Sequence, residues 1–229
     1  CDTHSLDQGL KLFKKAIAID ENYHSSHSFL LFNVNYCPNH TSEEIFSYYQ
    51  QFNDKFGLPL QKEWQPFTPS KKPKKKLKIG YVSPDFRKHS AQNDLLPTLA
   101  HHDHKKFEIF AFAELSKEDH VTKQYQSYVD HWIPTQSLTD QHMVQKIRDM
   151  EIDILVDLAG HTKGNRLGVF ARKPAPVSLS WWIGSAYTTG LSSIDYFITD
   201  DVMAPEGNEN LFSEKICHLP HHAAIWDPD

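Results

Sequence analysis

The stretch KIGYVSPDFRKHS, residues 78–90, decides the fold that this sequence predicts. Its first half is apolar and β-prone, and Ser83-Pro84 then stops the run, which is typical of a buried strand that ends in a loop. The loop carries a carboxylate, Asp85, and an imidazole, His89, four residues apart. In open α/β sheets, ligands bind at the loops that follow the carboxyl ends of strands. The stretch therefore predicts a strand with an acid/base pair at its functional end.

Four further apolar runs predict the other strands of the same sheet. The first strand is expected at residues 77–82, and the others at residues 107–113, 152–158, 177–182 and 196–199. Several runs are hydrophobic at nearly every position, as burial on both faces of a parallel sheet requires. Helical patterns around residues 94–101, 121–131 and 138–150 alternate with them. The alternation predicts an α/β fold with a Rossmann-like, doubly wound parallel sheet, whose right-handed crossovers place the loops after the strands along one edge.

The amino-terminal part of the sequence predicts a small all-α segment before the sheet. Residues 8–20 place apolar side chains at helical spacing with lysines opposite, and residues 24–36 continue the helical pattern. A third helix is expected from Thr41, where Glu44 completes a capping box, to the Gly-Leu-Pro triplet at residues 57–59. The first helix resembles the second helix of a tetratricopeptide repeat, and a generic packing helix fits the same pattern.

A segment rich in proline and lysine divides the sequence. Three prolines and five lysines gather between residues 66 and 76, which predicts a solvated linker, with a polyanion-binding patch as the alternative. We therefore expect three parts: a helical segment at residues 1–65, the linker at residues 66–76, and a Rossmann-like lobe at residues 77–229.

Composition limits the classes of partner. A chain of 229 residues with 39% hydrophobic residues can bury a full core, and its net charge of -5 does not indicate nucleic-acid binding. Its apolar runs are too short for a membrane span, and a signal-peptide pattern is missing from the sequence. Three widely spaced cysteines indicate a reducing, cytoplasmic setting. The start at Cys1 leads us to expect that the sequence is cut from a longer one.

Two more loops follow predicted strands and carry polar or glycine residues. The second loop is AGHTKGNR, residues 159–166, and the third is WIGSAYTTG, residues 182–190. Glycines in the second loop permit close backbone approach, and Lys163 and Arg166 offer donors for an anionic or hydroxyl-rich ligand. If the sheet is parallel, all three loops converge. The 15 histidines show no recognisable ligand spacing, so we expect no metal site.

Residue type alone leaves a structural alternative for the first loop. Asp85 could cap the next helix, and His89 could satisfy a backbone carbonyl. Glycine fingerprints of dinucleotide or phosphate loops do not occur in the sequence.

Several short motifs follow one another in order over roughly 140 residues. They are GYVSPDF at residues 80–86, IDILVDL at 152–158, KPAPV at 173–177, WIG at 182–184, TTGL at 188–191 and ITD at 198–200. This order closely resembles the catalytic region of the O-linked N-acetylglucosamine transferase and SPINDLY family. The resemblance implies a two-lobed glycosyltransferase fold of the GT-B type, whose amino-terminal lobe begins near Lys76 and is preceded by the end of a tetratricopeptide-repeat region.

The resemblance also implies roles for individual residues. Asp85 and His89 match residues proposed in the family as proton acceptor or organiser of the active site. The positions that match donor- or substrate-binding residues are His27, His161, Arg166, Ile183 and Gly184.

The implied function is transfer of a sugar, in the first place N-acetylglucosamine, from a nucleotide donor to Ser or Thr of proteins. The hydroxyl must be held in line and lose its proton, which is work for His89 or Asp85. The donor is UDP-N-acetylglucosamine or GDP-fucose, and neither a metal nor another cofactor is expected. Expected partners are the nucleotide sugar, protein or peptide acceptors and a second catalytic lobe, with neither nucleic acid nor membrane involved.

Two departures from the family pattern keep a rival open. The sequence stops at Asp229, where a linker to the second lobe is expected, so we expect this stretch alone to be inactive. The triplet Ser185-Ala186-Tyr187 replaces the residues usual before the Thr-Thr-Gly motif. A non-catalytic repeat-protein scaffold with a degenerate transferase lobe is therefore the alternative.

Overall fold

A parallel sheet forms the centre of the structure. The computed structural model describes residues 3–67, 76–181, 187–220 and 223, with side chains from residue 6 onward. The strands are β1 (Leu77–Ser83), β2 (Phe107–Ala113), β3 (His131–Pro134), β4 (Ile154–Asp157), β5 (Val177–Trp181), β6 (Tyr196–Thr199) and β7 (Lys215–His218). Within these described ranges the seven strands form one sheet in the order β3-β2-β1-β4-β5-β6-β7, and every neighbouring pair is parallel. The predicted α/β fold is confirmed, as are all five predicted strands; β3 and β7 were not predicted.

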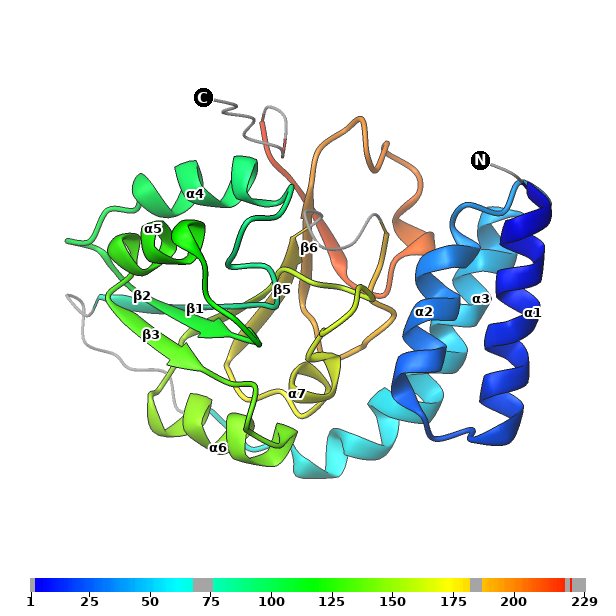
Figure 1. Ribbon diagram of the computed structural model, residues 1–229, viewed down its shortest axis with the longest axis horizontal. Coiled ribbons are helices and arrows are strands. Elements are labelled where there is room, and N and C mark those ends of the chain that lie inside the picture. The colour runs from blue at the N-terminus through cyan, green and yellow to red at the C-terminus, as the bar shows by residue number, and fades with distance from the viewer. Residues whose placement is uncertain (1–2, 68–75, 182–186, 221–222, 224–229) are drawn as a thin grey trace.

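Helices cover both faces of the sheet. They are α4 (Gln92–Ala100), α5 (His120–Tyr128), α6 (Asp140–Asp149) and α7 (Leu167–Ala171). Figure 1 shows α4 and α5 on one face and α6 and α7 on the other. The starts of α5 and α6 are fixed by side chains that accept hydrogen bonds from the helix backbone, Asp119 from Thr122 N and Thr139 from His142 N. This three-layer arrangement is the doubly wound fold that the strand and helix alternation predicted.

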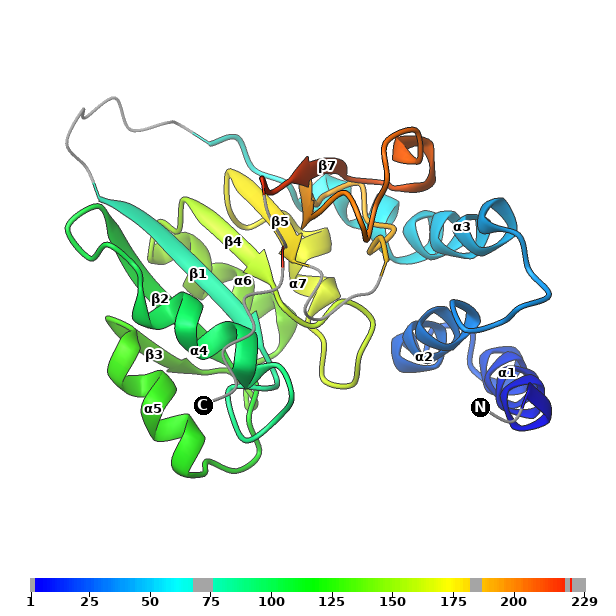
Figure 2. The ribbon, with the colours of Figure 1, turned by 90° about the horizontal axis from the view of Figure 1, so that it is seen from above.

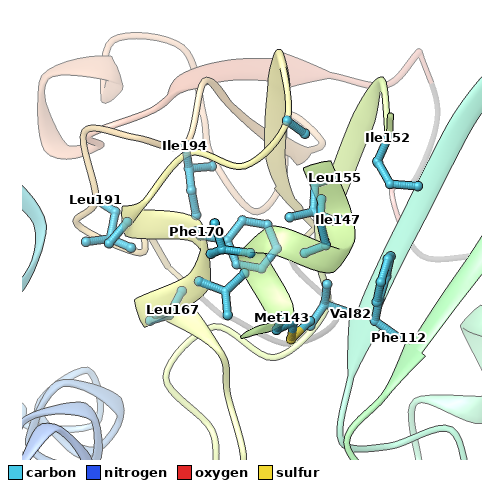
Figure 3. Packing of buried hydrophobic residues seen from close by; sticks show 14 of the residues in the cluster. Val82, Phe112, Met143, Ile147, Ile152, Leu155, Leu167, Phe170, Leu191 and Ile194 are labelled. Atoms are coloured by element: carbon cyan, nitrogen blue, oxygen red, sulfur yellow. The ribbon is translucent and has the colours of Figure 1, made fainter. Parts of the chain in front are cut away.

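The hydrophobic core is largest on the face that carries α6 and α7. Val82, Leu155 and Phe112 from the sheet meet Met143 of α6 and Phe170 of α7, and all five are less than 5% exposed. Figure 3 shows these side chains interlocking between the strands and the two helices. The opposite face buries a second cluster against α4 and α5. Burial on both faces explains why the central strands are hydrophobic at nearly every position.

Three helices precede the sheet: α1 (Thr3–Ile19), α2 (His24–Val34) and α3 (Ser42–Phe52). The predicted capping box at the start of α3 is present, with Glu44 N donating to Thr41 and Thr41 N donating to Glu44. The predicted end of this helix at residues 57–59 is wrong. The chain continues as a π-helical turn, Asn53–Gly57, and a 3-10 helix, Leu58–Glu63.

Gly57 explains why the chain does not stop where the triplet predicted. A Cβ built on Gly57 would lie 2.2 Å from Asn53 Oδ1, so glycine permits the wide turn instead of ending the helix. Pro59 lies in the first turn of the 3-10 helix, where its missing N–H leaves no hydrogen bond unmade.

The helical segment packs directly against the sheet. Tyr49 and Phe52 of α3 belong to the same hydrophobic cluster as Val82 of β1. Trp64 Nε1 donates to Ala171 O at 2.8 Å, at the end of α7. Most of the predicted linker, residues 68–75, lies outside the described residues, and the proposed division into three parts stays a prediction.

Candidate active site

The three loops singled out in the sequence meet at one edge of the sheet. β1, β4 and β5 are parallel neighbours, so the loops that follow them leave from the same edge, toward which β1 and β4 run together in Figure 2. A Cβ built on Gly164 would lie 2.9 Å from Pro84 Cβ, so the second loop touches the first. His161 Nε2 donates to Thr189 O at 2.8 Å, so the second loop also touches the third. This convergence fits a binding site at the carboxyl edge.

In the first loop, Arg87 and His89 both approach one carboxylate oxygen of Asp85. Asp85 Oδ1 accepts a hydrogen bond from Arg87 Nη2 at 2.9 Å, and His89 Nε2 lies 3.9 Å from the same oxygen. Ala91 N donates to His89 Nδ1 at 3.3 Å. Because Nδ1 accepts a hydrogen bond, the neutral ring carries its proton on Nε2, which faces Asp85.

Exposure separates this loop from a purely structural turn. The Asp85 side chain is 13% exposed and the His89 side chain 39% exposed, so both reach solvent. The two structural contacts considered for these residues differ from those observed. α4 begins after Ala91, one turn beyond Asp85, and His89 bonds a backbone N–H, not a carbonyl.

A buried carboxylate shapes the start of the second loop. Asp157, at the end of β4, accepts hydrogen bonds from Ala159 N at 3.1 Å, Gly160 N at 2.9 Å and Ser180 Oγ at 3.0 Å. Burial raises the pKa of the Asp157 carboxyl, and the hydrogen bonds offset part of that effect. Sequence reasoning missed this residue, although an acid inside an otherwise apolar strand run was a visible signal.

His161 of the second loop points into the core. It is 1% exposed, donates from Nε2 to Thr189 O, and accepts at Nδ1 from Ser28 Oγ at 3.2 Å. The rings of Tyr49 and Phe52 pack edge-on against it. Burial lowers the pKa of His161 to about 3, so the ring is neutral. The structure thus gives His161 a role in holding α2, the second loop and the third loop together.

Arg166 is also held within the protein. Its side chain is 14% exposed. Its nitrogens donate at 2.9 Å to Glu114 Oε2, Asp140 Oδ1, Thr135 O and Leu138 O. These acceptors lie after β2, after β3 and at the start of α6. The guanidinium therefore fastens neighbouring loops at the carboxyl edge.

The helical segment contributes His27, the other residue named from the resemblance that the structure describes. His27 Nε2 donates to Glu21 O at 2.9 Å, and the ring packs edge-on against Phe56. Burial lowers the pKa of His27 below its usual value. Ile183 and Gly184 lie outside the described residues.

The described part of the third loop is anchored by a second buried acid that sequence reasoning missed. Glu214 accepts from Thr188 Oγ at 2.6 Å, from Thr189 N at 2.8 Å and from the Thr189 hydroxyl. Burial raises the pKa of the Glu214 carboxyl. Glu214 lies 25 residues beyond Thr189, so a local sequence signal for this pair did not exist.

Across the described stretches, His, Cys, Asp and Glu side chains do not gather in groups of three or more that could hold a metal ion. Among the helices of those same stretches, none is long and apolar enough to cross a membrane.

Comparisons with known proteins agree with the fold. The sequence model of glycosyl transferase family 41 matches residues 53–228. A probable UDP-N-acetylglucosamine–peptide N-acetylglucosaminyltransferase SPINDLY from Solanum lycopersicum is 32% identical over 86% of this chain and 22% of its own length. The corresponding SEC protein of Arabidopsis thaliana is 35% identical over 73% of this chain and 17% of its own length.

A solved structure extends the match to the helical segment. A mutant of the O-GlcNAc transferase from Thermobaculum terrenum superposes with a TM-score of 0.92 and 29% identity, covering 99% of this chain and 44% of that one. The chain thus spans about a fifth of the length of the curated relatives that it matches. With its family model covering most of the sequence and its three loops meeting at one edge, this chain belongs to glycosyl transferase family 41.

Proposed function

We propose that this chain is the acceptor-side part of a protein O-glycosyltransferase, which transfers N-acetylglucosamine from a nucleotide donor to Ser or Thr of proteins. The observation that carries the proposal is the first loop, where Asp85 and the Nε2 atom of His89 face each other in partial contact with solvent. Family membership and the neighbouring second and third loops support the same reading.

The geometry favours different roles for the two side chains. In the transfer, the acceptor oxygen bonds to the anomeric carbon, the bond from that carbon to the donor phosphate breaks, and the nucleoside diphosphate leaves with the electron pair. The hydroxyl proton must go to a base, and Asp85 presents carboxylate oxygens for it. His89 carries a proton on Nε2, so it is suited to orient Asp85 or the acceptor oxygen as a donor.

The relatives favour one donor of the two that the sequence left open. The plant relatives are named for UDP-N-acetylglucosamine, and we propose the same donor for this chain. The proposed partners are a Ser- or Thr-bearing polypeptide and a second lobe that contacts the diphosphate. Catalysis without a metal or other cofactor stays a prediction, as does the division into helical segment, linker and lobe.

A transfer assay tests the proposal. The full-length gene product is incubated with a Ser-containing peptide and either UDP-N-acetylglucosamine or GDP-fucose, and peptide mass is followed. Addition of one N-acetylhexosamine from the uridine donor is expected. Transfer from GDP-fucose alone would overturn the donor assignment, and modification by neither donor would overturn the proposed function.

A further inference from the structure

Arg87 is the one arginine of the chain whose side chain is exposed to solvent. The sequence contains four arginines, and all four lie in described ranges. Arg166 and Arg172 are 14% and 11% exposed and donate to carboxylates and carbonyls of the protein. Arg148 donates to Glu63 O and to a second backbone carbonyl. The Arg87 side chain is 45% exposed and lies in the loop of the proposed catalytic pair.

Arg87 and His89 approach the same oxygen of Asp85. Arg87 Nη2 holds Oδ1 at 2.9 Å, whereas His89 Nε2 lies 3.9 Å away, beyond hydrogen-bond range. While Arg87 donates to Oδ1, that oxygen is engaged with the guanidinium and not with an acceptor hydroxyl or with His89. In the observed arrangement, Oδ1 of the proposed base is therefore taken by Arg87.

The loop backbone is fixed independently of the Arg87 side chain. Lys88 N donates to Asp119 Oδ2 at 2.8 Å, and Gln92 N donates to His89 O at 3.0 Å. A second hydrogen bond of the Arg87 side chain, from Nε to Pro84 O, is long at 3.4 Å. The guanidinium can thus leave Asp85 while the backbone of the loop keeps its place, and the side chain of His89 can then turn toward Asp85.

We propose that Arg87 is an anion-binding residue of this site: a phosphate of the nucleotide sugar draws the guanidinium off Asp85, which frees Asp85 for the acceptor hydroxyl and lets His89 approach it. The inference rests on the proposed function. A planar guanidinium binds phosphate oxygens in a bidentate manner, and a half-exposed ion pair is held weakly enough to exchange. Binding of the donor phosphate to Arg87 then also breaks the ion pair between Arg87 and Asp85.

Ligand affinity tests this exchange, with the neighbouring lysine as a matched control. UDP and uridine are titrated into the full-length gene product and its Arg87→Ala, Arg87→Lys and Lys88→Ala variants. Lys88→Ala removes the same charge one residue away and keeps the backbone bond to Asp119. We expect Arg87→Ala to weaken UDP about tenfold, Arg87→Lys to restore part of the loss, and Lys88→Ala to stay within about twofold. Uridine, which lacks phosphates, should bind all four proteins equally.

Kinetics provide a second readout that a merely structural role would not give. Arg87→Ala should raise KM for the nucleotide sugar more than it lowers kcat at saturation, because the variant lacks the phosphate contact but has an uncovered base. Unchanged UDP affinity in Arg87→Ala, an equal loss of uridine affinity, or an equal loss in Lys88→Ala would overturn the inference while leaving the proposed function intact. Failure of the unmodified protein to bind UDP at all would instead overturn the uridine donor of the proposed function, on which the inference rests.

Discussion

His161 and His89 lie on neighbouring loops in different surroundings. His89 accepts one long backbone hydrogen bond and reaches solvent, whereas His161 is enclosed by two hydrogen-bond partners and two aromatic rings. In water an imidazole gains a proton near pH 6.5, but the core around His161 offers little solvation for that charge. Burial therefore disfavours the protonated form of His161.

Acid should destabilise the fold through His161. The folded pKa is lowered from 6.5 to about 3, so between these values the unfolded chain binds a proton that the folded chain does not. This contributes a loss of about 1.4 kcal/mol per pH unit as the pH falls, and no effect above pH 6.5. His161→Gln keeps a donor for Thr189 O but cannot titrate. Urea unfolding should show a shallower pH dependence for His161→Gln than for the unmodified protein between about pH 6 and pH 4; equal slopes would contradict the assignment.

Gly190 should be required for a close approach as well as for its backbone angle. Its φ is +79°, and a Cβ there would lie 2.7 Å from Tyr49 O of α3. Gly207 has a φ of +91° but open space around it, so it serves as the control. We expect Gly190→Ala to lower the free energy of unfolding by about 2–4 kcal/mol and Gly207→Ala by about 1 kcal/mol. Equal losses in chemical denaturation would show that α3 does not press on the third loop.

At the scale of elements, Arg166 connects the ends of β2 and β3 with the start of α6. Each of these loops is short, and each leaves acceptors that one guanidinium satisfies. A lysine carries the same charge but cannot reach four acceptors in a plane.

Arg166→Lys should therefore lower the free energy of unfolding and have little effect on ligand binding. The acids Glu114 and Asp140 would lose directed hydrogen bonds in a largely buried site, at a cost of about 2–4 kcal/mol in the free energy of unfolding. Lys163→Ala, an exposed change on the same loop, is the control and should leave unfolding unaltered. If Arg166→Lys instead kept full stability and raised KM for the donor, the ligand-binding role implied by the family resemblance would be favoured.

The elements that sequence reasoning found and missed differ in burial. Strands covered on both faces gave continuous apolar runs and were all predicted. β3 and β7 form the two edges of the sheet and are four residues long; β3 has one buried residue and β7 has none. Such segments carry too little hydrophobic pattern to stand out from a loop. The π-helical turn after α3 was missed because a Gly-Leu-Pro triplet usually ends a helix, and here glycine instead makes room for Asn53.

At the scale of the whole molecule, the helical segment forms part of the frame around the candidate site. Ser28 of α2 bonds His161, and Asn53 Oδ1 accepts from Ser192 N at 3.1 Å. The partners in these pairs are more than 130 residues apart in sequence. A proline- and lysine-rich stretch in the sequence therefore did not mean separation in space.

The position of the candidate site could be predicted from the sequence, but the roles of its individual side chains could not. Strand alternation placed three loops at one edge, and the carboxylate and imidazole on the first loop were visible as residue types. The sequence could not show that His161 and Arg166 turn inward, since their burial depends on distant partners. The sequence also gave no role to Arg87. Only the structure shows that the Arg87 guanidinium and the His89 imidazole approach the same oxygen of Asp85.

The most direct test of the account is the rate of sugar transfer by the full-length gene product after single changes in the first loop. Asp85→Asn and His89→Ala should each lower kcat, Asp85→Asn by about 10²–10⁴-fold, with the unfolding midpoint unchanged. Asp103→Asn, an exposed acid outside these loops, should transfer N-acetylglucosamine to the peptide at the unmodified rate. Unmodified rates for Asp85→Asn and His89→Ala would contradict the central claim that this loop acts on the acceptor hydroxyl.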